Sequence, residues 1–168
     1  MNNRDEAEKS ESKAPDVFTD GRGGSITILA EGSATTPMRY RMVLPQGLGP
    51  PPERHPNQTE HFRVISGVFD LGYINGKHVE LRAGQTFTLP AGTVHRPMNN
   101  YAEPAEFEAT LTPGLASAAM FRSTYAAVRT QRGIGFALRM ALIIDRHPAE
   151  VEFTPAVRIT MRLLGGCH

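Results

Sequence analysis

Residues 47–67 read GLGPPPERHPNQTEHFRVISG, and residues 84–99 read GQTFTLPAGTVHRPMN. The two stretches carry four side chains that can bind a metal ion: Glu53, His55, Glu60 and His95. Alternate side chains of an extended segment point the same way, so Glu53 and His55 are expected to face one side. Two histidines and a carboxylate that converge from separate strands suit a divalent first-row metal and leave positions open for substrate.

Short strand-like runs surround these stretches. The pattern predicts strands at 25–30, 38–44, 60–67, 68–74, 77–81, 86–89, 94–98 and 105–112. Asn75-Gly76 lies between two β-rich runs and is the strongest short signal for a hairpin, because both residues tolerate a positive φ. Regularly spaced short strands joined by turns indicate a mainly β sandwich or barrel.

Arg39 and Arg41 alternate with apolar residues in the predicted strand 38–44. Side chains of alternate residues lie on opposite faces of a sheet, so the arginines share the face away from the core. A solvated face is the preferred interpretation. The alternative is that these arginines bind a carboxylate substrate, if their face lines a cavity.

The pattern changes to helical after Pro113-Gly114. Phe121, Tyr125 and Val128 are spaced as one face of a helix, and the run 136–144 is apolar almost all round. A third helix is expected to begin at Thr154-Pro155, with Val157, Met161 and Leu164 on one stripe, and to end at Gly165-Gly166. We expect the run 136–144 to be buried against the barrel or against a second subunit, which favours a homodimer.

Composition excludes several classes of protein. The formal net charge of +1 gives no overall attraction to nucleic acid or membrane. Arginines after residue 116 could line a nucleic-acid groove, but the outer faces of amphipathic helices explain them better. Residues 1–15 are expected to form a disordered tail without the apolar core of a signal peptide, which favours a cytoplasmic protein. Cys167 is the single cysteine and is interpreted as an incidental surface thiol.

The spacing of the two stretches resembles the two motifs of the cupin superfamily. The first motif, G-x5-H-x-H-x3-4-E-x6-G, aligns with residues 47–67, except that Glu53 replaces its first histidine. The second motif, G-x5-P-x-G-x2-H-x3-N, matches residues 84–99 completely. Two motifs in the right order are a far more specific signal than a single glycine pattern.

This resemblance implies a double-stranded β-helix (jelly-roll) barrel over residues 16–113. Residues 114–168 would form a C-terminal helical appendage, packed on the barrel or at a dimer interface. By position, His55, Glu60 and His95 match the ligands of a divalent metal: iron, manganese, zinc or nickel. Glu53 is either a fourth ligand, which hardens the site, or a catalytic base beside the metal.

Three functions remain open at this stage. The first is a metal-dependent enzyme acting on a small organic molecule, most simply an oxidoreductase of the dioxygenase type. The second is a non-redox isomerase, cyclase or lyase in which the metal acts as a Lewis acid and Glu53 moves a proton. The third is a non-catalytic cupin that binds a small molecule, with Glu53 merely pairing with Arg54 at the surface. No nucleic-acid or membrane partner is expected.

Five further polar residues are assigned structural or surface roles. Asn99 is expected to hold a turn rather than a substrate. His61 alternates away from Glu60 and is expected outside the barrel. The remaining histidines are not expected to be ligands: His78, His147 and His168.

Overall fold

The computed structural model describes residues 15–131, 133–157 and 159–160. Residues 1–14 of the expected tail lie outside the described residues. So do Met161, Leu164, the expected helix end at Gly165-Gly166, Cys167 and His168. The strands are β1 (Asp16–Thr19), β2 (Ser25–Ala30), β3 (Met38–Leu44), β4 (Glu53–Arg54), β5 (Thr59–Ser66), β6 (Val68–Ile74), β7 (Lys77–Arg82), β8 (Thr86–Leu89), β9 (Ala105–Thr112) and β10 (Glu152–Phe153). The helices are α1 (Ser117–Thr130) and α2 (Gly133–Arg146).

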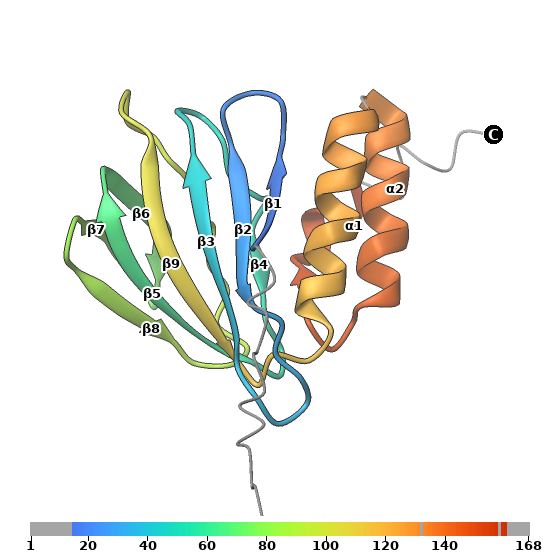
Figure 1. The fold of residues 1–168 in the computed structure, drawn as a ribbon, viewed down its shortest axis with the longest axis horizontal. Helices are drawn as coiled ribbons and strands as arrows, with labels where there is room; N and C mark the ends of the chain where they lie inside the picture. The colour runs from blue at the N-terminus through green and yellow to red at the C-terminus, as the bar shows by residue number, and fades with distance from the viewer. Residues whose placement is uncertain (1–14, 132, 158, 161–168) are drawn as a thin grey trace, which may run out of the picture.

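The strands form a jelly-roll barrel whose sheets do not close completely. Six strands make one sheet in the order β1-β2-β3-β9-β5-β8, and β6 pairs with β7 as a separate hairpin. The short pair β4-β10 joins the middle of the chain to its C-terminal part. Figure 1 shows the sheets curving together, with both helices on the side of β1 and β4. The predicted mainly β barrel with a helical appendage is confirmed.

Alternation of side chains builds the barrel core. The burial of β9 alternates along its length, with Ala105, Phe107, Ala109 and Leu111 all buried. The ring of Phe107 stacks on that of Phe69 with centroids 4.1 Å apart, and Phe62 contacts both rings. Aromatic burial of this kind supplies much of the hydrophobic stabilisation of a small barrel.

The outer face of the same sheet carries the arginines. Arg41 of β3 lies 2.8 Å from Glu108 of β9, and Arg63 of β5 lies 2.9 Å from the other oxygen of the same carboxylate. Arg39 is exposed and lies 3.9 Å from Glu108. The interpretation of Arg39 and Arg41 as residues of a solvated face is therefore confirmed.

The predicted strand at 94–98 is wrong. The structure has only isolated bridges there, between His95 and Glu53 and between Met98 and Asp70. Pro97 between them has no N–H to donate to a strand ladder. The segment thus touches two different strands in succession, which alternation alone did not reveal.

The sequence analysis also missed three short strands: β1, β4 and β10. β4 and β10 are 2 residues each, too short to show a period. β1 pairs along its whole length with β2, from Asp16 opposite Ile28 to Thr19 opposite Ser25. It begins directly after the segment interpreted as a tail.

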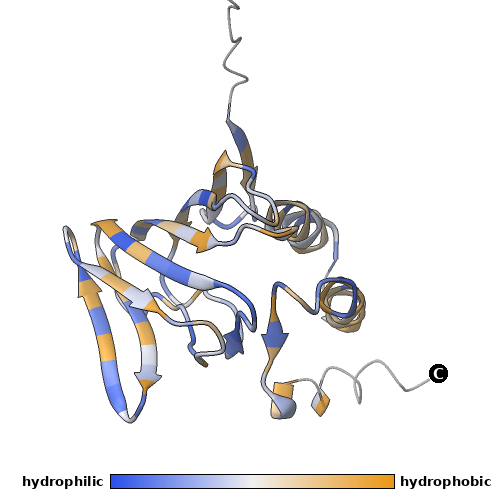
Figure 2. Ribbon diagram, turned by 90° about the horizontal axis from the view of Figure 1, so that it is seen from below, coloured by the Kyte–Doolittle hydropathy of each residue, from blue (hydrophilic) through white to orange (hydrophobic). Residues whose placement is uncertain are grey.

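The two helices pack beside the open edge of the barrel, and Figure 2 views them nearly end-on. Arg122 of α1 pairs with Asp16 at 2.5 Å and with Glu31, which ties the helix to the edge of the sheet. The run 136–144 is not buried all round, since Leu142 is 52% exposed. The homodimer that this run was thought to indicate stays a prediction.

Residues 155–157 and 159–160 are helical, as expected from Thr154-Pro155. A second apolar cluster links the helices to β10 through Met120, Ala127, Met140, Ile143, Val151 and Phe153. Within the described residues, no helix combines the length and the apolar character needed to cross a bilayer.

Candidate metal centre

Four predicted site residues meet at the end of the barrel that faces the helices. Glu53 lies in β4, His55 follows directly after it, and Glu60 lies in β5. His95 reaches them because its segment forms a bridge with Glu53: each backbone N–H donates to the other's carbonyl, at 3.0 and 2.9 Å. The N–H of Gly92 also donates to the carbonyl of His55 at 2.8 Å, so both halves of the site are joined through the backbone.

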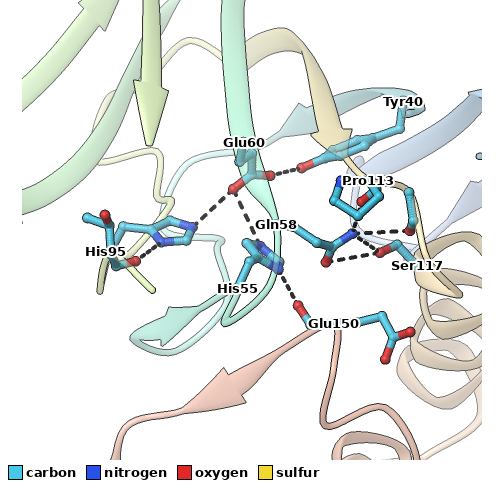
Figure 3. Close-up of polar contacts among 10 residues, drawn as sticks. Tyr40, His55, Gln58, Glu60, His95, Pro113, Ser117 and Glu150 are labelled. Atoms are coloured by element: carbon cyan, nitrogen blue, oxygen red, sulfur yellow. Dashed lines mark hydrogen bonds and ion pairs between the residues drawn. The ribbon is translucent and has the colours of Figure 1, made fainter. Parts of the chain in front are cut away.

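Glu60 lies at the centre of the group, as Figure 3 shows. Its Oε2 atom is 3.4 Å from Nε2 of His55 and 3.3 Å from Nε2 of His95. The hydroxyl of Tyr40 donates to the other carboxylate oxygen, Oε1, at 2.6 Å. All three partners are buried, so this is a water-poor cluster of one carboxylate and two imidazoles.

Hydrogen bonds fix the orientation of both rings. Nδ1 of His55 lies 2.6 Å from the carbonyl of Glu150, and Nδ1 of His95 lies 3.1 Å from the carbonyl of Thr93. A carbonyl only accepts, so each Nδ1 carries the proton. In the neutral rings, both Nε2 lone pairs therefore point toward the Glu60 carboxylate.

The acceptor atoms of these three side chains show whether the residues fit a metal ion. Among the described residues, Glu60 Oε2 and His95 Nε2 are buried without a hydrogen-bond partner. Three acceptor atoms facing one another are repulsive unless a cation or added protons lie between them. Imidazole held by a carbonyl on its far nitrogen is also the usual form of a metal-binding histidine. The donor set fits a divalent ion.

Glu53 is placed beside both histidines. One ligand atom each from Glu53, His55 and His95 lies within 4.8 Å of the other two, so this group could hold a metal ion. Burial raises the pKa of the Glu53 carboxyl, and the two histidines partly oppose that change. Glu53 does not pair with Arg54, whose guanidinium instead contacts Glu152 at 2.6 Å. The alternative of a surface pair between Glu53 and Arg54 is therefore wrong.

The charges in this cluster depend on one another. Burial alone would raise the pKa of Glu60, but His55 and His95 lower it well below its ordinary value. Burial would lower the pKa of His55, yet Glu60 outweighs it and raises that pKa to about 9. The pKa of His95 is raised in the same way. A proton on either imidazole offsets the negative charge of the ionised Glu60, as a metal ion bound between these groups would.

A cavity of about 350 Å³ opens from the site toward the helices. Tyr40, Glu53, His55 and Glu60 line its inner end. Strands β3, β5 and β9 supply apolar walls, and α1 and α2 supply the roof. The volume lies at the small end of the range of roughly 300–1,000 Å³ that is usual for small-molecule sites.

The C-terminal segment supports the first half of the site. β10 pairs with β4, with Phe153 opposite Glu53. Just before β10, the carbonyl of Glu150 accepts from His55, while its side-chain Oε1 accepts from the N–H of Ala116 at 3.0 Å. Glu150 therefore connects the His55 ring to the start of α1.

Gln58 is a second buried link between barrel and helices. Its Nε2 atom donates to the carbonyls of Pro113 and Gly114, at 2.7 and 3.1 Å, and to the hydroxyl of Ser117 at 2.9 Å. These contacts fix where the chain leaves β9 and enters α1. Sequence reasoning missed Gln58, Glu150 and the polar role of Tyr40.

The remaining motif residues have structural roles. Asn99 is fully buried, and its amide donates to the carbonyls of Leu44 and Glu103 at 2.9 and 2.8 Å. The prediction that it holds a turn is confirmed. A side chain at Gly67, whose φ is 72°, would place a Cβ 2.4 Å from the carbonyl of Pro104. That position therefore requires glycine.

The other described histidines lie away from the centre. His61 contacts the hydroxyl of Thr88 at 2.8 Å on the exposed face. His78 pairs with Asp70 in the β6-β7 hairpin at 3.0 Å. His147 lies 3.7 Å from its near neighbour Glu150. Their assignment as non-ligands agrees with these positions.

Comparisons with known proteins agree with this architecture. A cupin domain model matches residues 40–112. The rhicadhesin receptor of Pisum sativum is 40% identical over 65 residues, which are 36% of this chain and 30% of that protein. Germin-like protein subfamily 2 member 1 of Arabidopsis thaliana is 36% identical over 89 residues, covering 48% of this chain and 40% of that protein. The chain thus spans well under half the length of these curated relatives.

A solved structure from Klebsiella pneumoniae, an uncharacterised conserved protein with a double-stranded β-helix domain, is 27% identical with a TM-score of 0.48. The match covers 54% of this chain and 76% of the Klebsiella chain. The matched residues 40–112 run from β3 to the end of β9 and include every residue of the candidate centre named in the sequence analysis. With both motifs folded into one barrel end, residues 40–112 of this chain match the cupin domain.

Proposed function

We propose that the protein is a metal-dependent enzyme of the oxygenase type that acts on a small organic molecule. His55, Glu60 and His95 hold the metal, and Glu53 is the fourth ligand or a base beside it. The observation that carries this proposal is the convergence of two imidazole Nε2 atoms on one carboxylate oxygen, 3.4 and 3.3 Å away. That carboxylate oxygen and His95 Nε2 find no hydrogen bond among the described residues.

The donor atoms narrow the choice of metal. Two imidazoles with one or two carboxylates are harder than a three-histidine set, which favours iron(II), manganese or zinc over copper(I). Nickel remains compatible with imidazole ligands. Two histidines and one carboxylate on one face correspond to the arrangement used by non-haem iron(II) oxygenases. Bound iron(II) would supply the redox chemistry that the side chains lack.

The protein's own groups position and enclose the site. The hydroxyl of Tyr40 holds Glu60, and the carbonyls of Glu150 and Thr93 hold the two imidazole rings. α1 and α2 line the cavity above them, which reduces the contact of its inner end with water and strengthens electrostatic interactions there. Glu53 lines the cavity and can accept a proton from a bound molecule.

Oxygen uptake tests the oxygenase proposal. Protein purified without oxygen and reloaded with iron(II) is expected to consume oxygen with at least one member of a panel of aromatic and thiol compounds. His95→Ala, loaded in the same way, is the control and is expected to show no uptake above free iron. Iron-loaded protein that consumes no oxygen with any compound would contradict the oxygenase proposal.

A non-redox isomerase, cyclase or lyase is the second candidate. The raised pKa of Glu53 and its place in the cavity wall favour it, because a general base works best with a pKa near the operating pH. Under this proposal a zinc- or manganese-loaded protein turns over substrate without oxygen. Full turnover by Glu53→Gln would remove the base role from this candidate.

A further inference from the structure

We propose that the cavity takes an apolar molecule, aromatic or aliphatic, that carries one oxygen-donor group at its inner end, and that α1 and α2 select it. This inference rests on the proposed metal centre and adds the substrate class. It depends on how polar and apolar side chains are distributed along the cavity.

The roof of the cavity is apolar over most of its area. α2 contributes Phe136, Met140 and Ile144 to the lining. α1 contributes Met120, Phe121 and Val128, with Thr124 and Tyr125 between them. These residues belong to the part of the chain outside residues 40–112, so the roof is supplied by the helices and not by the cupin domain.

The barrel side of the cavity is also apolar until its inner end. Met42, Leu44, Phe62 and Phe107 line it from β3, β5 and β9. Tyr40 also lines the cavity, but its hydroxyl already donates to Glu60. The groups left to receive a polar atom of a ligand at this end are those of the metal centre and Glu53.

This distribution disfavours sugars and their acids. Each buried hydroxyl that finds no partner costs about 1–3 kcal/mol. A polyol would bring several hydroxyls against the phenylalanine and methionine side chains of the walls. Asp20 and Arg22 also line the cavity, from the turn between β1 and β2, where the Asp20 carboxylate already accepts from the N–H groups of Arg22 and Gly24. A molecule with one polar end and an apolar body satisfies both regions.

Matched hydroxamates provide a direct test, because they share one metal-binding group and differ only in their bodies. Zinc uptake by the full chain is measured first by calorimetry. Acetohydroxamate, 3-phenylpropionohydroxamate and gluconohydroxamate are then titrated into the zinc-loaded protein. We expect the phenyl compound to bind at least 10-fold tighter than either of the others.

Two substitutions on α2 provide the matched pair. Met140 lines the cavity, whereas Leu142 on the same helix is exposed and does not. Met140→Gln is expected to weaken binding of the phenyl compound about 10-fold and to leave acetohydroxamate unchanged. Leu142→Gln is expected to change neither. Thermal unfolding of both variants shows whether the fold is retained, and Phe136→Asn replaces Met140→Gln if that variant unfolds.

The outcomes separate this inference from the metal proposal. If the protein takes up zinc but binds all three hydroxamates equally tightly, or prefers gluconohydroxamate, the proposed substrate class is overturned and the metal centre stands. Absence of zinc uptake would overturn the metal centre. The walls are then tested on metal-free protein with 2-phenylethanol, which has no chelating group: Met140→Gln should weaken its binding, and an unchanged affinity would overturn the apolar site.

Discussion

The carbonyl of Glu150 lies 2.6 Å from Nδ1 of His55, although the two residues are 95 positions apart in the chain. The hydrogen bond fixes the ring so that Nε2 faces Glu60. It also makes the C-terminal part of the chain a support for the candidate metal centre. The side chain of Glu150 anchors this support through the N–H of Ala116.

Glu150→Ala keeps the backbone carbonyl that holds His55 but removes the side-chain contact with the N–H of Ala116, which anchors that carbonyl. Zinc affinity is therefore expected to fall about 10-fold, the lower end of the 10- to 100-fold that partners of ligating histidines contribute. Glu150→Gln keeps an oxygen that can accept from Ala116 and should stay within about threefold of wild type. Chelator competition on folded protein measures both affinities. Equal affinities for all three proteins would show that the Glu150 contact does not position His55.

Tyr40→Phe should reduce the free energy of unfolding of the metal-free protein by about 1.5–3 kcal/mol, the usual contribution of a hydrogen bond to a charged group. The reason is that the buried Glu60 Oε1 loses the hydroxyl 2.6 Å away. Urea unfolding measures the change. Tyr73→Phe is the control, because Tyr73 is 74% exposed. Removing its hydroxyl should change the free energy of unfolding by less than about 0.5 kcal/mol. Equal changes in the two variants would contradict a specific Tyr40–Glu60 bond.

Gln58→Leu is expected to destabilise the protein by about 2–3 kcal/mol, since buried carbonyls of Pro113 and Gly114 lose their donor. Amide hydrogen exchange should accelerate in α1 more than in β9, because the contact holds the entry to the helix. Asn57→Ala is the neighbouring control, since its side chain donates to a single carbonyl at an exposed position. Uniform acceleration over the whole protein would contradict a local anchoring role.

Glu108 links the pH dependence of stability to the outer face of the sheet. Hydrogen bonds from Arg41 and Arg63 lower the pKa of its carboxyl. A lowered folded pKa gives stability that is present above the unfolded value, about 4.3, and is lost as the pH falls through the folded value. Glu108→Gln should therefore cost about 1 kcal/mol at pH 7, and this cost should shrink as the pH falls from 7 to about 3. Denaturant unfolding at both pH values measures this, and a loss that persists at low pH would contradict the ionic origin.

The barrel could be predicted from sequence because its signals are local. Alternating residues, the Asn75-Gly76 turn and two spaced motifs identified most strands, and His55, Glu60 and His95 followed from the motif positions. The short strands β4 and β10 could not be predicted, since 2 residues show no period and their pairing joins distant parts of the chain.

The residues that support the site differ in how clearly the sequence indicates their roles. Tyr40 had a signal, because a tyrosine on an inward face needs a hydrogen-bond partner and Glu60 points inward as well. Glu150 had none, since it acts through a backbone carbonyl, which every residue has. Within one chain, the expected burial of the run 136–144 holds at Met140 and Ile143 but not at Leu142, which is 52% exposed. Burial of that face against a second subunit stays a prediction.

The central claim is that His55, Glu60 and His95 hold a divalent metal, and the metal content of freshly purified protein tests it most directly. Elemental analysis is expected to find close to one divalent ion per chain in the wild type and only a trace in His95→Ala, with both variants folded by circular dichroism. A wild type without stoichiometric metal, or a content that His95→Ala leaves unchanged, would contradict the metal centre and favour a non-catalytic binding cupin.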